Sequence, residues 1–146
     1  MKGRMEFEEL REMLLYRRIV KWEGNRITLD NGIEISIEET ERDCCACASG
    51  EFTDVVLDAA ITNVGDIEYE PWDTEDDEWS CGEYGCNASV TIMHNRNVIC
   101  KAIGGADAGN CGYYYSIASF VVKIPAVGVK VCHFVGSVDG ERRSDD

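Results

Sequence analysis

The chain has 146 residues, with 14 Lys or Arg against 28 Asp or Glu, and its formal net charge is −14. A chain of this length is expected to form one domain and to bury roughly 70% of the surface that its unfolded state exposes. A surface this acidic repels phosphate backbones and anionic lipids. The composition therefore argues against direct nucleic-acid binding and against polybasic attachment to a membrane.

The negative charge is concentrated in the middle of the chain. Residues 43–95 hold 13 acidic side chains and no Lys or Arg, and the densest part runs from Asp66 to Glu83. The segments on either side are close to neutral. The charge pattern therefore predicts a localised acidic surface rather than a uniformly acidic protein.

The N-terminal segment has neither the apolar run nor the small-residue cleavage site of a signal peptide. Apolar stretches elsewhere, such as residues 117–122, are far shorter than the ~20 residues that a membrane span needs. We therefore expect an intracellular protein without membrane contact. In that setting the eight cysteines are expected to be thiols rather than a disulfide framework.

The first predicted element is a helix over residues 5–16, where apolar side chains recur at three- and four-residue spacing. A β-meander is expected next, because period-two alternation is combined with Gly-containing turns. Its three strands are expected at residues 18–23, 26–29 and 33–38.

The middle of the chain is less regular. Residues 40–51 contain clustered cysteines and small residues, which indicates a loop, and apolar spacing in residues 52–60 favours a short helix. Residues 61–70 are expected to be extended. Residues 71–87 lack any periodicity and are predicted to form a long acidic loop.

The C-terminal part is predicted to be mostly strand. Strands are expected at residues 88–94, 98–103, 113–124 and 129–135, with a glycine-rich connection at residues 104–112. Together these elements predict an α+β domain. Its antiparallel sheet would have about seven or eight strands, accompanied by the N-terminal helix and one further short helix. The domain would span residues 1–138, and residues 139–146 would form a disordered tail.

The acidic loop contains two tryptophans where the local pattern does not call for large apolar rings. Exposed aromatic rings beside acids are typical of contact sites for a protein partner, whereas rings that fold back onto the sheet would pin the loop. The order of the acids does not match a calcium-binding EF-hand. The candidate partner-binding residues are Trp72, Asp73, Glu75, Asp76, Asp77, Glu78 and Trp79.

A zinc site is an alternative role for some of the cysteines. Zinc usually takes four sulfur or nitrogen ligands from two short Cys-x-x-Cys-like knuckles, and only Cys81 and Cys86 approach that spacing. Buried cysteines that act as small apolar residues are the competing interpretation. The candidate ligands are Cys44, Cys47, Cys81 and Cys86. No other cofactor is expected.

Enzymatic activity would require a reactive thiol. Cys44 or Cys45 could be paired with His94 or His133, but the chain has no nucleophile elbow or other signature of a thiol enzyme. We therefore expect a protein that is not an enzyme.

Two short motifs together resemble a family of small bacteriophage proteins of unknown function. The first is Arg42-Asp43-Cys44-Cys45 followed by an expected acidic helix and Ile61-Thr62. The second is Cys111-Gly112-Tyr113-Tyr114-Tyr115-Ser116, similar to a Gly-Tyr-Tyr-Ser motif of that family. The resemblance spans about residues 10 to 122. It implies a phage gene product made in the cytoplasm of a bacterial host, and it implies no catalytic residue.

These observations favour a non-enzymatic phage accessory protein that binds and modulates a host protein, in host takeover or defence evasion. One alternative is a small-ligand or metal-binding module, whose pocket would be lined by Cys44, Cys45, Tyr113 and Tyr114 if the two motifs meet in space. Another is an acidic nucleic-acid mimic that inhibits a host nuclease, which would need acids spread over a broad face. The oligomeric state stays open.

Overall fold

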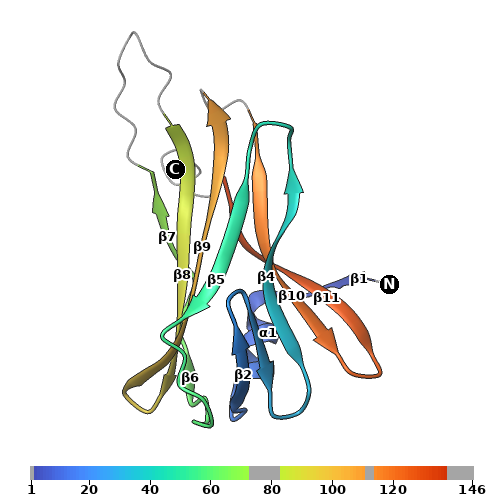
Figure 1. Ribbon diagram of the computed structural model, residues 1–146, viewed down its shortest axis with the longest axis vertical. Helices are drawn as coiled ribbons and strands as arrows, with labels where there is room; N and C mark the ends of the chain where they lie inside the picture. The colour runs from blue at the N-terminus through green and yellow to red at the C-terminus, as the bar shows by residue number, and fades with distance from the viewer. Residues whose placement is uncertain (1, 73–82, 111–113, 138–146) are drawn as a thin grey trace.

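The computed structural model describes residues 2–72, 83–110 and 114–137, which fold into a mainly β structure (Figure 1). This part of the chain contains eleven strands and one helix. In chain order the elements are β1 (Lys2–Arg4), α1 (Phe7–Leu14), β2 (Ile19–Glu23), β3 (Arg26–Leu29), β4 (Glu34–Arg42), β5 (Ala48–Thr53), β6 (Asn63–Val64), β7 (Glu68–Pro71), β8 (Glu83–His94), β9 (Asn97–Asn110), β10 (Ser116–Ile124) and β11 (Gly128–Gly136).

The strands form two sheets that pack against each other. The six-stranded sheet has the order β1-β11-β10-β4-β3-β2, and its β1–β11 pair is parallel while the other pairs are antiparallel. The five-stranded sheet has the antiparallel order β5-β9-β8-β6, with β7 also pairing with β8. In Figure 1 the connection between β4 and β5 passes from one sheet to the other. Residues 43–47 form this connection.

A group of aromatic rings joins the two sheets and the helix. The ring of Phe120 on β10 lies 4.5 Å from that of Phe134 on β11 and 6.5 Å from that of Phe52 on β5. Phe7 of α1 contacts the same Phe120 ring from 6.5 Å, and Leu10 is buried beside it. Burial of these side chains removes apolar surface from water, which is the dominant favourable contribution to folding.

A glycine on β9 lets the two sheets approach closely. A Cβ atom at Gly104 would lie 2.7 Å from the Phe134 ring and 3.2 Å from the carbonyl oxygen of Ser49. Any larger residue at this position would have to displace a buried aromatic ring.

The structure corrects the predicted fold class, because the second expected helix is absent from the described residues. β5 covers Phe52, and the backbone then turns with positive φ angles at Asp54 and Asp58. The backbone N–H groups of Val56 and Asp58 donate to the carbonyls of Ile99 and Ile19, so they pair with other strands instead of forming a helix. The protein is therefore mainly β, with two sheets rather than one.

Three other boundaries also differ from the sequence prediction. The predicted loop at residues 40–51 is mostly strand, and the predicted connection at residues 104–112 belongs to β9 as far as Asn110. β8 begins at Glu83, so strand occupies the last part of the predicted acidic loop. Residues 73–82 of that loop and the predicted tail at residues 139–146 lie outside the described residues. Within the described chain, no helix is long and apolar enough to cross a membrane.

Candidate functional site

A groove of about 1200 Å³ lies on the face of the five-stranded sheet that points away from the core. Along β8 and β9 the side chains alternate, so that Ala88 and Ala102 are buried while Asn87 and Ile103 are exposed on the opposite face. We call this the outer groove. Its walls are the outward side chains of β5 and β7, and its floor is formed by β8 and β9.

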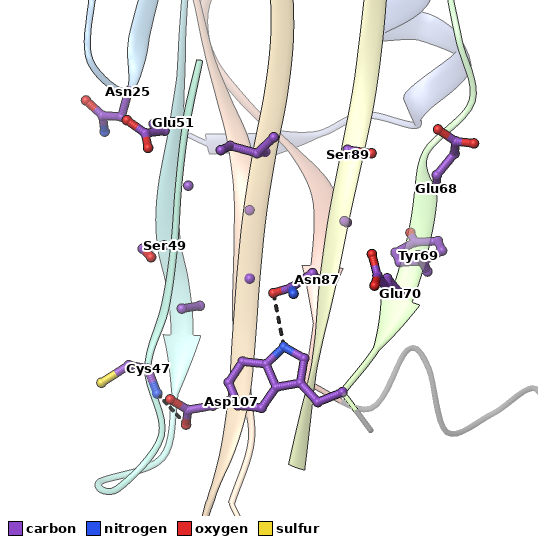
Figure 2. A pocket seen from close by; sticks show the side chains of 17 residues that line it. Asn25, Cys47, Ser49, Glu51, Glu68, Tyr69, Glu70, Asn87, Ser89 and Asp107 are labelled. Atoms are coloured by element: carbon purple, nitrogen blue, oxygen red, sulfur yellow. Dashed lines mark hydrogen bonds between the residues drawn. The ribbon is translucent and has the colours of Figure 1, made fainter. Parts of the chain in front are cut away.

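The register of the strands places carboxylates on both walls. Glu51 on β5 pairs with Ile103, which pairs with Ser89, which pairs with Glu68 on β7. Figure 2 shows Glu51 at one side of the groove and Glu68 and Glu70 at the other. The two walls are three strand spacings apart, or about 14 Å.

Small residues keep the middle of the groove open. The next row across the sheet contains Ser49, Gly105 and Asn87, followed by Glu70. A Cβ atom at Gly105 would lie 2.8 Å from the side-chain oxygen of Asn87. Glycine at this outward position therefore preserves both the depth of the groove and the orientation of Asn87.

Trp72 lies at one end of the groove and is held against the sheet. Its indole Nε1 donates a hydrogen bond of 3.0 Å to the Asn87 Oδ1, the dashed line at Asn87 in Figure 2. Its backbone N–H donates to the carbonyl of Gly85, and a Cβ atom at Gly85 would lie 2.9 Å from the indole ring. Trp72 is thus half-buried and fixed, and it still lines the groove.

The lining of the groove is negatively charged. Glu51, Glu68, Glu70 and Asp107 line it, and the residues described there include no Lys or Arg. Lys101 lies two positions before Ile103 on β9, in the next row of the sheet, and it is outside the lining of the groove. Within the part of the chain that the structure describes, none of the three glutamates forms an ion pair. Their charges are therefore available to a ligand.

Asp107 fixes the end of the groove to the connection between the sheets. One of its carboxylate oxygens accepts hydrogen bonds of 3.0 Å from the backbone N–H groups of Cys47 and Gly109. The backbone N–H of Asp107 donates to the Cys47 carbonyl. The buried Ser116 hydroxyl lies 2.9 Å and 2.8 Å from the carbonyl oxygens of Cys47 and Asp107, so it donates to this pair as well.

The two sequence motifs meet at the same end of the molecule. The backbone N–H of Asp43 donates to the Tyr115 carbonyl, and the Tyr115 N–H donates to the Asp43 carboxylate. The sulfur atoms of the exposed Cys44 and Cys45 lie 2.8 Å apart. Hydrogen bonding to Cys45 raises the pKa of Cys44 and that of the Tyr114 hydroxyl. We call Cys44, Cys45 and Tyr114 the thiol cluster; Tyr113, the fourth residue expected there, lies outside the described residues.

The predicted zinc ligands are not gathered into one site in the described structure. Cys44 and Cys47 are exposed, whereas Cys86 is fully buried on the core side of β8, and Cys81 is not among the described residues. No group of three or more His, Cys, Asp or Glu among the described residues could hold a metal ion.

The histidines and the remaining cysteines occupy other surroundings. His94 Nδ1 lies 2.7 Å from the carbonyl oxygen of Ala60, and His133 is exposed on β11. Cys100 and Cys132 are buried inside strands, as the apolar interpretation of the cysteines predicts. Burial raises the pKa of each of these two thiols to about 12.

Sequence reasoning identified Trp72 but missed most of the groove. Glu68 and Glu70 alternate with a tyrosine on β7, a period-two pattern that indicates which acids share a face. Asp107 lies among glycines and small residues, and its role depends on a contact with Cys47 that is 60 residues away in the chain. The remaining predicted partner-binding residues, Asp73, Glu75, Asp76, Asp77, Glu78 and Trp79, lie outside the described residues.

Comparison with known proteins gives a family but no activity. No curated protein and no solved structure gave a match. Residues 12–121 match a family that is described as a domain of unknown function (DUF7448). This match covers both motifs of the thiol cluster, the outer groove and the centres of both sheets. The chain therefore belongs to the DUF7448 family.

Proposed function

We propose that the protein is a phage-encoded accessory protein that acts in the cytoplasm of a bacterial host. It binds and modulates a host protein, in host takeover or defence evasion, and catalyses no reaction. The resemblance of its two motifs to small bacteriophage proteins supports the proposed origin. The single observation that carries the binding role is the outer groove, where carboxylates on two walls, which form no ion pair with any residue that the structure describes, adjoin a fixed tryptophan.

The physical argument is one of charge and anchoring. Carboxylates on a concave surface attract basic segments and raise the rate of encounter, while a buried tryptophan often provides much of the binding energy at a protein interface. The side chain of Trp72 would lose little conformational freedom when a partner binds, because its contacts with Asn87 and Gly85 already fix its position. The acids that follow Trp72 in the sequence lie outside the described residues and remain part of the proposed contact.

A charge-neutralised variant tests this proposal. Tagged wild-type protein and the triple variant E51Q/E68Q/E70Q would be used to purify partners from infected cells, with quantification by mass spectrometry. The matched control is E9Q/E12Q/E41Q, which removes three exposed acids outside the groove. We expect the control to retain the partner and the groove variant to lose most of it. Equal recovery by both variants, or no partner with the wild type, would contradict the proposal.

A small-ligand module is the second candidate, because the two motifs do meet at the thiol cluster. Cys44, Cys45 and Tyr114 provide two soft sulfur atoms and a phenol at an exposed position. Native mass spectrometry of purified protein would reveal a bound small molecule or metal as added mass. If a ligand is present, its loss in the variant C44S/C45S and retention in C47S would locate it.

A nucleic-acid mimic is a weaker third candidate. Mimicry needs regularly spread charge, whereas the outward face of the six-stranded sheet carries both signs, such as Glu34 opposite Lys123. The localised groove favours a basic protein segment instead. Competition between DNA and the protein for a purified host nuclease would be the sign of mimicry.

A further inference from the structure

The two acidic walls of the outer groove stand too far apart for one basic side chain. Glu51 and Glu68 lie in the same row of the sheet, separated by Ile103 and Ser89. A chain that runs along the middle of the groove would be about 7 Å from each wall, given strand spacings of about 4.8 Å. A single Lys or Arg on that chain reaches the carboxylates of one wall and leaves the negative charge of the other wall without a positive partner.

An extended chain solves this problem with two neighbouring residues. In an extended conformation, side chains at positions i and i+1 point in opposite directions, while those at i and i+2 point the same way. Adjacent basic residues would therefore reach Glu51 on one wall and Glu68 or Glu70 on the other. A pair of basic residues separated by one position would reach only one wall.

The small floor and the tryptophan favour the same occupant. Ser89 and Gly105 leave space beside the larger Ile103 and Asn87 for a backbone to lie close to the sheet. The ring of Trp72 is packed on Gly85, and a planar guanidinium can stack on such a fixed aromatic face. Arginine fits this position better than lysine, whose compact charge is more strongly hydrated.

We infer that the outer groove binds an extended segment of the host partner that carries two adjacent arginines, one directed to each acidic wall. This inference rests on the proposed function, because it identifies the partner segment that the groove would take. It adds a spacing rule and a preference for arginine, which general attraction between opposite charges does not provide.

Two labelled peptides of identical composition test the spacing rule. Both contain Gly, Ser and two Arg; in one the arginines are adjacent, and in the other a glycine separates them. Fluorescence anisotropy would give the affinity of each peptide for the full-length protein. We expect the adjacent pair to bind about five-fold more tightly, as one additional ion pair of about 1 kcal/mol would give.

Single variants locate the effect. E51Q removes the negative charge of Glu51 from one wall. The adjacent-arginine peptide should then bind less than about two-fold more tightly than the separated one, whereas E12Q on α1 should leave the difference in affinity unchanged. In the variant W72A, we expect the preference for Arg-Arg over Lys-Lys peptides to decrease. Circular dichroism of each variant confirms that the fold is retained.

The outcomes separate this inference from the proposed function. Equal affinity for the two arginine peptides, or an advantage that persists in E51Q, would overturn the inference. The proposed function would still stand if host capture depended on the three groove glutamates. Failure of both peptides to bind overturns the inference as well, and the host-capture experiment then decides the proposed function independently.

Discussion

The two sheets contribute to the protein in different ways. In the centre of the six-stranded sheet, Ile35 faces Val122 and Ile37 faces Phe120, so large side chains fill the core. In the centre of the five-stranded sheet the corresponding inward residues are small, since Ala88 faces Gly104 and Val90 faces Ala102.

The outward faces differ as well. On the six-stranded sheet Ser36 and Val121 lie opposite each other and are only 4% and 6% exposed, so neighbouring side chains cover them. On the five-stranded sheet the outward floor is open, and Ile103 is 37% exposed. One sheet therefore provides the bulk of the core, and the other provides a hollow surface. This division explains why the candidate site lies on the sheet with the smaller residues.

The largest expected effect comes from the aromatic centre of the six-stranded sheet. Phe120→Ala should lower the free energy of unfolding by about 3–5 kcal/mol, because it removes a ring that contacts Phe7, Phe52 and Phe134. Urea denaturation would measure this loss. Val127→Ala, at a position that is 70% exposed, should change stability by less than about 0.5 kcal/mol. Similar losses of stability in both variants would contradict the distinction between core and surface positions.

Two neighbouring glycines on β9 should respond differently to the same substitution. Gly104→Ala places a Cβ 2.7 Å from the Phe134 ring and should cost about 1–3 kcal/mol of stability. Gly105→Ala places a Cβ 2.8 Å from the side-chain oxygen of the exposed Asn87, which can shift more easily than a buried ring, and should cost less, while it reduces the affinity of the groove for basic peptides. Thermal denaturation and peptide titration of both variants would show whether stability and binding separate between the two faces.

Alkaline pH should weaken both sheets through their buried thiols. Burial raises the pKa of Cys100 to about 12 from the ordinary thiol value of 9.0, so the unfolded chain loses this proton first. Folding stability is therefore complete below about pH 9 and falls between about pH 9 and 12, by up to about 1.4 kcal/mol per pH unit for Cys100. Cys132 on the six-stranded sheet should contribute similarly, because burial also raises its pKa to about 12.

Denaturation at several pH values would compare the wild type with C100A and C132A. Each variant should lose less stability than the wild type as the pH rises, and the change should be of similar size in C100A and C132A. Identical slopes in all three proteins would show that other groups control alkaline unfolding.

The smallest expected effect concerns the tryptophan at the groove. Asn87→Ala removes the acceptor of the Trp72 indole N–H and should cost about 0.5–1 kcal/mol, since both groups are partly accessible to water. Emission from Trp72, measured with Trp22 and Trp79 replaced by Phe, should shift toward that of a hydrated indole. Asn63→Ala on the exposed edge strand β6 is the control and should leave the emission unchanged.

Local patterns predicted the elements that depend on short-range physics. The β-meander is present as β2, β3 and the start of β4, because apolar alternation and tight turns depend only on residues that are neighbours in the sequence. The N-terminal helix is also present, at Phe7–Leu14. The predicted strand at residues 98–103 exists but continues to Asn110, since small residues that favour turns in isolation can also pack in a close sheet.

Features that depend on distant contacts were not predictable in this way. The spacing of Phe52, Val55, Val56 and Ala59 fits a helix, yet β5 pairs with β9 and overrides the local preference. The division of the strands between two sheets likewise depends on which residues pair across the chain. The groove combines Glu51 with Glu68 across four strands, and a single sequence does not reveal that register.

The alternation along β8 and β9 also affects how this protein can change over time. A substitution at Ser89 or Gly105 alters the floor of the groove, while the adjacent inward residues keep the hydrophobic core unchanged. Selection can therefore act on the binding face one position at a time without first compensating for lost stability. A binding surface made of outward side chains on a sheet would let such a protein acquire substitutions that match changes in its target while its fold stays the same.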